Sequence, residues 1–315
     1  MGAAMQLSER IGRRLKLQDL HVLMTVVQAG SMGKAAQRLN TTQPAISRSI
    51  AELEHALGVR LLDRSRQGIA PTKYGEALLD CGTAVFDDLR QGVKRIEFLA
   101  DPTHGEIIIG GNEAIIAGPL STVFDRLRRR HPGIAIHVRH LPAPAQQHYE
   151  LRERKVDLIL GRIAAPAEDD VESEVLFRDR IHVVAGRDSH WSRRRKIELA
   201  ELAHAPWGLP PPDTLIGSLV ADAFRARGME LPRGGMATGS IHFLNALLAR
   251  GPFLAIVPDS VLRFGVNLPP LKVLPVTLPV PPWPVGIMTL KNRMPSPAAR
   301  LFIECTREVV RQLGK

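Results

Sequence analysis

Cysteine is scarce in this sequence: its 315 residues include only Cys81 and Cys305. Two cysteines cannot build a disulfide framework or a cysteine-ligated metal cluster, so a reducing compartment is the simpler interpretation. The N-terminus lacks the apolar core of a secretory signal, and no run reaches the roughly 18 apolar residues that a membrane span needs. We therefore expect a soluble cytoplasmic protein that has no membrane partner.

Motifs for catalysis are also missing. The sequence has no Gly-rich phosphate loop of useful spacing, no His-Glu-x-x-His and no Gly-x-Ser-x-Gly. Its eleven histidines are scattered, and the pair Gly110-Gly111 is weak evidence for a nucleotide-binding turn. Two adjacent glycines at a strand end more simply let the backbone approach a ligand. We expect no catalytic residue, no metal site and no cofactor, so the sequence does not predict an enzyme.

Positive charge is in excess and is concentrated near the N-terminus. The net charge is +10 and the pI is about 10.2. Residues 1–75 hold 11 Lys and Arg against 5 Asp and Glu, whereas residues 76–101 hold 3 against 6. The N-terminal segment therefore has the charge that contact with DNA phosphates requires, although many solvated surfaces are basic too. For the basic cluster at residues 10–16, a solvated extension is favoured over an arm that contacts DNA.

Two short helices are predicted at the start of this basic segment. Apolar residues recur at helical spacing from Leu17 and stop at Gly30, which is typical of a helix C-terminus. Ser31 can act as the N-cap of a second helix over residues 34–39, in which Ala35 and Ala36 allow close packing.

A third helix follows the turn at residues 40–41. Thr42 can cap it, Pro44 lies in its first turn where a missing N–H costs nothing, and Gly58 ends it. Its apolar stripe comprises Ala45, Ile46, Ile50, Leu53 and Leu57. Three short helices with this turn predict a helix-turn-helix, whose last helix enters the major groove of DNA. The residues expected to contact DNA from this helix are Thr42, Gln43, Pro44, Ser47, Arg48 and Ser49.

The next segment has the pattern of a wing. Residues 60–62 and 69–71 can pair as short strands, and Gly68 supports the tight turn between them. Arg64 and Arg66 in that turn can reach phosphates or a minor groove. Two arginines in a loop are usually only solubilising, but beside a helix-turn-helix we expect them to contact DNA.

A long helix is predicted from Thr72 to Ala100, because apolar residues recur at steps of three and four without a proline. One apolar seam of this length cannot be covered by a small winged domain, so the helix of a second subunit is its natural cover. Packing within one chain is the alternative. Asp101-Pro102 ends the helix. The seam consists of Tyr74, Leu78, Cys81, Val85, Leu89, Val93, Ile96 and Leu99. Within the seam, we expect Cys81 to be a small buried hydrophobic residue and not a redox sensor.

Several of these elements together resemble the N-terminal signature of LysR-type transcriptional regulators. The matching stretches are Ala35-Ala36-Gln37-Arg38-Leu39, Thr42-Gln43-Pro44-Ala45-Ile46-Ser47, and Leu53-Glu54 followed after four residues by Val59-Arg60-Leu61-Leu62-Asp63-Arg64. Thr72 and Gly75 match the start of the linker helix of that family. The resemblance implies a winged helix-turn-helix domain over 15–72, a linker and dimerisation helix over 73–101, and an effector-binding domain over 102–315. It also implies double-stranded operator DNA, a small-molecule effector and RNA polymerase as partners, and a homodimer through the linker helix that assembles into a homotetramer.

Beyond Pro102 strands and helices alternate, which indicates an α/β fold with mostly parallel sheets. Strands are expected at 106–110, 134–138, 156–160, 181–185, 253–257 and 285–290, and helices at 120–127, 219–224, 243–248 and 301–313. The fold class we expect is an α/β effector domain of two Rossmann-like lobes, preceded by an all-α winged helix-turn-helix domain and a long linker helix. The resemblance implies two crossings between the lobes, which we expect near 163–176 and 262–276. Lobe I would then comprise about 103–163 and 276–315, and lobe II about 177–262.

Ligands of such lobes bind at the carboxyl ends of strands and at helix N-termini. By resemblance, the expected effector residues are Asn112, Glu113, Ala114, Leu141, Arg162, Pro212, Ser240 and His242, with Gly111, Pro142, Ala143, Pro210, Asp213 and Thr238 nearby. Glu113 disfavours a carboxylate effector and suits a sugar or a cation, whereas Arg162 argues for a carboxylate, so the class of effector stays open.

We conclude that the sequence predicts a ligand-responsive regulator of transcription. One rival is a constitutive architectural DNA-binding protein with no effector. The other is an enzyme fused to a DNA-binding domain, for which no catalytic constellation is found.

Overall fold

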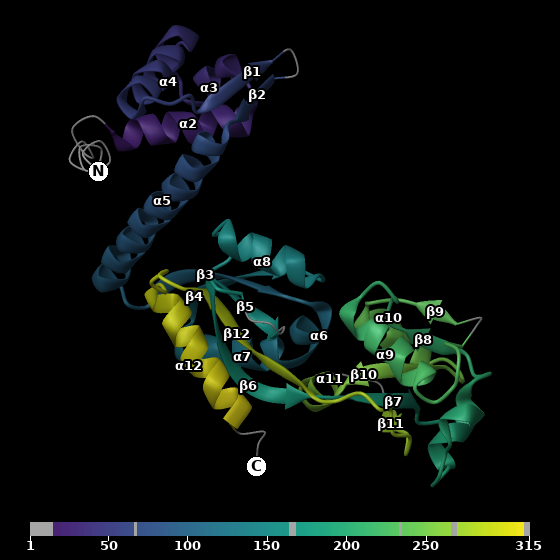
Figure 1. Ribbon diagram of the computed structural model, residues 1–315. Helices are drawn as coiled ribbons and strands as arrows, with labels where there is room; N and C mark the ends of the chain where they lie inside the picture. Colours follow the sequence, from purple (N-terminus) through teal and green to yellow (C-terminus); the bar gives the residue numbers. More distant parts are fainter. Residues whose placement is uncertain (1–14, 66–67, 164–167, 233–234, 266–269, 312–315) are drawn as a thin grey trace. The chain divides into compact units, whose positions relative to one another are not determined.

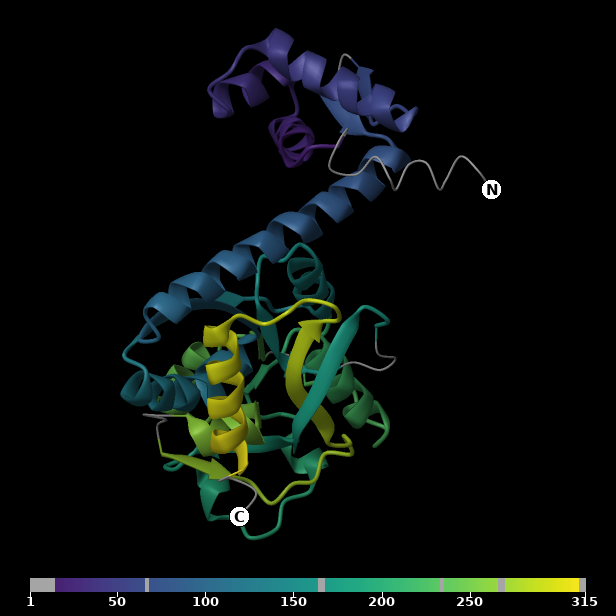
Figure 2. The ribbon, with the colours of Figure 1, turned by 90° about the vertical axis from the view of Figure 1, so that its left-hand side faces the viewer.

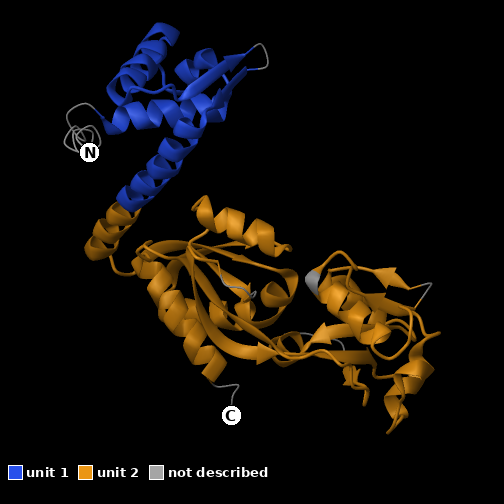
Figure 3. Ribbon diagram, in the orientation of Figure 1, with its two compact units in different colours: residues 1–90 blue, residues 91–315 orange. Residues whose placement is uncertain are grey.

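A computed structural model describes residues 15–65, 68–163, 168–232, 235–265 and 270–311. The chain divides into two compact units, Met1–Arg90 and Gln91–Lys315 (Figure 3). Among the described residues, every helix is too short or too polar to span a lipid bilayer.

Three helices form the core of the first unit (Figure 1). They are α2 (Leu17–Ala29), α3 (Met32–Arg38) and α4 (Gln43–Leu57). Gly30 and Gly58 end α2 and α4 in the left-handed conformation, with φ of 68° and 72°, as their positions in the sequence predict. The Oγ atom of Ser31 accepts a hydrogen bond from the backbone N–H of Lys34, so the predicted N-cap of α3 is confirmed. Ala45 is wrongly assigned to the apolar stripe of α4, because it is exposed.

The wing consists of β1 (Leu62–Ser65) and β2 (Gly68–Pro71), which pair antiparallel as predicted. Glu54 of α4 holds the base of this wing, since its Oε1 accepts hydrogen bonds from the backbone N–H groups of Leu61 and Leu62 at 2.7 and 3.2 Å. Gly75 packs against the same segment, where an added Cβ would lie 2.1 Å from the carbonyl oxygen of Leu61. A side chain at position 75 would therefore displace the wing.

The long helix α5 (Lys73–Ala100) runs without a break across the boundary of the two units. Its N-terminus is capped by Thr72, whose Oγ1 accepts a hydrogen bond from the N–H of Gly75 at 3.1 Å. The predicted seam is largely uncovered in the single chain: Leu89, Val93, Ile96 and Leu99 are 49% to 81% exposed. Cys81 is exposed too, so its expected burial depends on a partner.

The second unit contains two five-stranded sheets, as the fold class predicted. The first sheet has the order β4-β3-β5-β12-β6, and β12 is its only antiparallel strand within the described residues. Helices α6, η1, α7, α8 and α12 follow or cover these strands (Figures 1 and 2). The bounds are β3 (His104–Gly111), α6 (Glu113–Ile115), η1 (Ile116–Leu120), α7 (Ser121–Arg130), β4 (Gly133–His140), α8 (Pro144–Arg152), β5 (Leu158–Arg162), β6 (Val171–Asp179), β12 (Trp283–Leu290) and α12 (Pro297–Arg311).

The second sheet has the order β11-β7-β10-β8-β9, and here β7 is the antiparallel strand. Its apolar core includes Trp207 and Phe224, both fully buried, whose rings meet edge to face. The bounds are β7 (Ile181–Gly186), η2 (His190–Arg193), η3 (Leu199–Leu202), β8 (Trp207–Leu209), α9 (Leu215–Arg225), β9 (Met236–Ala237), α10 (Ile241–Leu248), β10 (Leu254–Pro258), α11 (Asp259–Phe264) and β11 (Leu271–Val273).

Both crossings between the lobes lie later in the chain than expected. Strand β6 pairs with β12 of the first sheet along its whole length, so the chain enters the second lobe at Arg180 and not within 163–176. Strand β11 pairs with β7, and Leu274 and Leu278 pack in the second core. The return to the first lobe therefore falls between Leu278 and Trp283 instead of within 262–276. The alternating pattern did not reveal β6, because its side chains lie at the edge of the sheet and its register shifts at a bulge opposite Val285 and Gly286.

Candidate functional site

The first candidate site is the outer face of α4, the second helix of the helix-turn-helix. Thr42, Gln43, Pro44 and Arg48 are exposed at its N-terminal end, and Ser47 is half-buried. The opposite face packs into the core through Ile46, Ile50 and Leu53. Short polar side chains and one arginine are thus presented on a rigid element, which suits insertion into the major groove.

Ser49 and Thr42, both expected on this face, differ in whether their side chains are available for DNA contact. The Oγ atom of Ser49 donates a hydrogen bond to Oδ1 of Asp19 on α2 at 2.8 Å, so this side chain fixes α4 to α2 instead of facing outward. Thr42 occupies the N-cap position, but its side chain accepts no capping hydrogen bond. Ser49 is therefore a poor candidate for DNA contact, while the hydroxyl of Thr42 remains available.

The wing adds to the surface formed by the outer face of α4. Arg64 is exposed on β1. Arg66 lies outside the described residues. Sequence reasoning passed over Lys34 and Arg38, which are exposed on α3; their signal was a basic residue beside the turn of the motif.

The second candidate site is a cavity where strand ends of both lobes meet. We call it the strand-end cavity. Six strands reach it with the last residue of the strand or the residue that follows: Asn112 after β3, His140 of β4, Arg162 of β5, Pro210 after β8, Thr238 after β9 and Pro258 of β10. Convergence of strand carboxyl ends is the usual location of ligands in such folds.

The outer part of this cavity has a volume of about 380 Å³. Of the expected effector residues, Asn112, Glu113, Ala114 and Ser240 line it. Thr238 Oγ1 and Ser240 Oγ accept hydrogen bonds from the N–H groups of Ser240 and Phe243, which leaves their hydroxyl protons to be donated elsewhere. The remaining lining is mostly apolar and includes Pro142, Pro211, Ile216, Leu244 and Ile256.

The inner part has a volume of about 90 Å³ and contains Arg162. The guanidinium carbon of Arg162 lies 5.1 Å from the centroid of the Trp283 ring. Its Nη1 atom is buried and has no hydrogen-bond partner among the described residues. Burial lowers the pKa of this guanidinium from its ordinary value. The inner part is therefore a small space that contains a half-buried cation with one unsatisfied nitrogen.

Three expected effector residues do not line the cavity. Leu141 is buried in the core behind it, where an added Cβ on Gly110 would lie 2.6 Å from the Leu141 Cδ1 atom. The glycine at position 110 thus allows close packing of Leu141 rather than approach of a ligand. Pro212 is exposed and lies outside the lining, which ends at Pro211 in this segment. His242 is also exposed and outside the lining, two residues after the N-cap Ser240 of α10.

Sequence reasoning missed many of the lining residues, among them the polar or aromatic side chains of His140, Gln147, Asp179, Thr214 and Trp283. His140 ends a predicted strand, so the strand-end rule could have found it. Trp283 was hidden in the proline-rich segment, and Gln147 and Thr214 belong to helix starts that were not predicted. No group of three or more His, Cys, Asp or Glu in the described chain is arranged to hold a metal ion.

Comparison with known proteins identifies the family of both parts of the chain. Residues 17–76 match the family model described as "Bacterial regulatory helix-turn-helix protein, lysR family", and residues 100–311 match "LysR substrate binding domain". The chain is 24% identical to the uncharacterized HTH-type transcriptional regulator YdcI of Escherichia coli K12, over 96% of this chain and 99% of that protein. It is 26% identical to the HTH-type transcriptional regulator PcaQ of Agrobacterium fabrum, over 96% and 97%.

Solved structures show the same fold. CbnR, described as a LysR family transcriptional regulator, aligns with a TM-score of 0.59 at 20% identity, over 94% of this chain and 99% of CbnR. Full-length OxyR from Pseudomonas aeruginosa aligns with a TM-score of 0.63 at 22% identity, over 94% and 95%. The predicted arrangement of a helix-turn-helix, a long helix and a two-lobed α/β domain is thereby confirmed.

Proposed function

The chain belongs to the LysR family of DNA-binding transcriptional regulators, and from this premise we propose that a small organic acid, bound in the strand-end cavity, controls its action on DNA. Its relatives are named regulators and not enzymes. Modulation by an effector is typical of the family. The state of Arg162 is the observation that supports an acid as the effector.

Arg162 favours an anion because its own surroundings do not neutralise it. The side chain is half-buried and its Nη1 atom has no hydrogen-bond partner among the described residues, so a carboxylate placed against the guanidinium would supply that partner. Arginine also matches a carboxylate with two parallel hydrogen bonds. The ring of Trp283 limits the orientations of the guanidinium, so less side-chain entropy is lost when the anion binds.

The outer part of the cavity suggests the other end of the effector. Glu113 lines only the outer part and Arg162 only the inner part, where the lining also includes Asp179, whose carboxylate is hydrogen-bonded to Ser260. A carboxylate at Arg162 and a hydroxyl or amino group toward Glu113 would satisfy both. The apolar prolines and Ile216 between them suit a short hydrocarbon body. This arrangement reconciles the two expectations that the sequence left open.

On the DNA side, we propose that Gln43, Ser47 and Arg48 contact base edges and that Arg64 contacts the backbone. The exposed seam of α5 supports a homodimer through this helix, which would present two recognition helices to one operator. The family resemblance suggests a tetramer and contact with RNA polymerase as further steps.

Thermal unfolding of the full-length protein with a panel of organic acids, each paired with its neutral amide, tests the effector class. An acid that binds only the folded state at a hundredfold excess over Kd should raise stability by about 2.7 kcal/mol, and its amide should not. Arg162→Gln should abolish this shift. Arg227→Gln, an exposed arginine outside the cavity, is the matched control and should keep it.

DNA binding is measured in parallel by footprinting on the promoter region of the gene itself. The effector should change operator affinity about 5- to 150-fold in the wild type and not in Arg162→Gln. If neutral sugars act and no acid does, the proposed class is wrong. Broad protection without sequence preference, unaffected by any ligand, would instead support the architectural alternative.

A further inference from the structure

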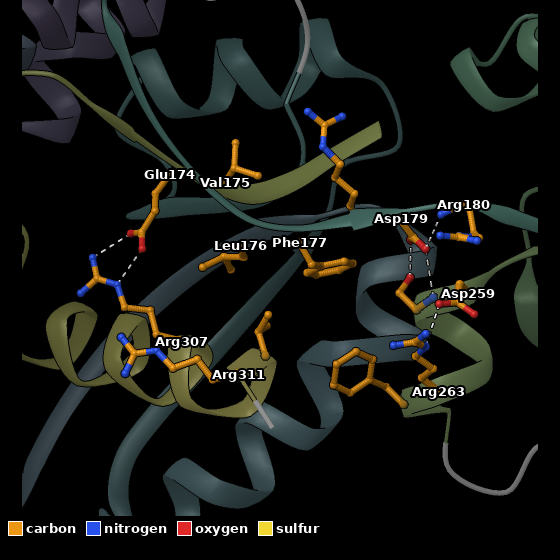
Figure 4. A pocket seen from close by; sticks show the side chains of 14 residues that line it. Glu174, Val175, Leu176, Phe177, Asp179, Arg180, Asp259, Arg263, Arg307 and Arg311 are labelled. Carbon is orange, nitrogen blue, oxygen red and sulfur yellow. Dashed lines mark hydrogen bonds and ion pairs between the residues drawn. The ribbon is translucent and has the colours of Figure 1, made fainter. Parts of the chain in front are cut away.

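A second cavity lies where the chain first passes between the lobes. We call it the crossing cavity. It has a volume of about 450 Å³ and is bounded by β6, by Arg180, by α11 and by the last turns of α12 (Figure 4). Asp179 alone is shared with the lining of the strand-end cavity. Nothing in the proposed function makes use of this space.

The crossing cavity has a basic group at each end and an apolar middle. Figure 4 shows Arg307 and Arg311 at one end and Arg180 and Arg263 at the other, with Leu176 and Phe177 between them. Phe264 and Val310, both buried, complete the apolar part of the lining. A ligand with acidic groups at both ends and a hydrocarbon middle would match this distribution.

Every carboxylate of the lining already has partners within the chain. Both oxygens of Glu174 accept hydrogen bonds from Arg307, at 2.8 and 2.7 Å, and these bonds lower the pKa of Glu174. Asp259 pairs with Arg263 at 2.7 Å. Asp179 accepts hydrogen bonds from the N–H and the Oγ of Ser260, at 3.1 and 2.6 Å. Glu174 also has a longer-range electrostatic interaction with Arg311, which lowers the pKa of Glu174 further.

Three arginines of the lining, Arg178, Arg180 and Arg311, form no ion pair within 4 Å of a described residue, and all three side chains are exposed. Arg180 and Arg311 lie at opposite ends of the cavity (Figure 4). Each is free to form the bidentate pair that arginine makes with a carboxylate.

We propose that the crossing cavity is a second ligand site, which binds a linear dicarboxylate with one carboxylate at Arg180 and the other at Arg311. The hydrocarbon chain lies over Leu176 and Phe177, where it covers apolar surface that the single chain leaves accessible. The volume is in the range of small-molecule sites, which favours a metabolite over a segment of another protein. Because Asp179 reaches both cavities, occupancy of this site is expected to affect the strand-end cavity next to it.

Isothermal titration calorimetry of the full-length protein with succinate, adipate and suberate tests the proposal. One of the three should bind, and hexanoate and adipamide should bind at least about tenfold more weakly, since hexanoate lacks one acidic end and adipamide lacks both. Arg180→Gln and Arg311→Gln should each weaken binding by about tenfold, and the double variant should abolish it. Because both residues are exposed and neither forms an ion pair within 4 Å of a described residue, each change should alter the thermal unfolding temperature little.

Two control variants separate this site from the effector site. Arg162→Gln should bind the dicarboxylate as the wild type does, and so should Arg227→Gln. Loss of binding in Arg162→Gln with retention in the double variant would place the dicarboxylate in the strand-end cavity and overturn the proposal. The proposal would also be overturned if hexanoate bound as tightly as the dicarboxylates, or if none of the three dicarboxylates produced heat. Dissociation of the oligomer in the double variant would overturn it too, because the surface would then be a subunit interface.

Discussion

Arg293 and Asp157 form a buried ion pair in the first lobe, with Nη2 of the arginine 3.0 Å from Oδ1 of the aspartate and side chains that are 6% and 7% exposed. The second carboxylate oxygen accepts a hydrogen bond from the backbone N–H of Ile108 at 2.8 Å, and Nη1 of Arg293 donates to the carbonyl of Val156 at 2.7 Å. The pair thus joins β3, the start of β5 and the end of β12. These three strands carry Asn112, Arg162 and Trp283 into the strand-end cavity.

Breaking this pair should destabilise the protein strongly. Arg293→Met leaves the Asp157 carboxylate buried without its cation, and removal of one partner of a buried pair costs about 3–5 kcal/mol. Urea unfolding followed by circular dichroism measures the loss. Arg300→Gln, an exposed position on α12, is the control and should change stability by less than about 0.5 kcal/mol. A loss below about 1 kcal/mol in Arg293→Met would mean that water replaces the arginine.

Substitution of Arg48 and of Arg64 should affect DNA binding in different ways. Arg48→Ala removes a base contact from α4, so discrimination at one operator position should fall by about 1–3 kcal/mol. Arg64→Ala removes a phosphate contact, so it should weaken all sequences alike and reduce the salt slope by about one. Binding selections on randomised operators and salt titrations distinguish the two. An unchanged sequence preference in Arg48→Ala would contradict the proposed docking of α4.

A charge on the seam of α5 should separate the subunits. Leu89→Glu places a carboxylate in the centre of the exposed apolar seam, where a partner helix would have to bury it. Analytical ultracentrifugation should show smaller species, and operator binding should weaken because linked half-sites gain from effective concentration. Ala77→Glu adds the same charge at an exposed position outside the seam and should do neither. A wild type that sediments as a monomer at micromolar concentration would end this proposal.

Acid should weaken the contact between Glu174 and Arg307. Hydrogen bonds from Arg307 lower the pKa of Glu174 below its ordinary value of 4.5, so the pair stabilises the folded state above that pH and ceases to do so as the pH falls through the lowered pKa. Arg307→Gln should therefore be less stable than the wild type at neutral pH, by at most about 1 kcal/mol because the pair is partly exposed. The two unfolding temperatures should converge as the pH falls through the lowered pKa of Glu174. A difference that stays constant in acid would show that Arg307 acts through packing and not through Glu174.

The sequence by itself determined the features that depend on neighbours along the chain. The ends of α2 and α4 are given by Gly30 and Gly58, because only glycine readily adopts the left-handed conformation that ends these helices. The cap at Ser31, the length of α5 and the strand ends at Asn112 and Arg162 are likewise local properties. Together with the spacing of the N-terminal motif, they were sufficient to predict the fold class and the family.

Only the tertiary structure decided which side chains face one another. Ser49 belongs to the polar face of α4 by spacing, yet it bonds to Asp19, thirty positions away on another helix. Strand β6 joins the first sheet because β12 returns from the far end of the chain to pair with it. The surroundings of Arg162 come from segments of both lobes, and they leave one of its buried nitrogens without a partner among the described residues. Hydrogen bonding and burial are set by distances in space, and no local pattern of the chain encodes the register or packing that brings such residues together.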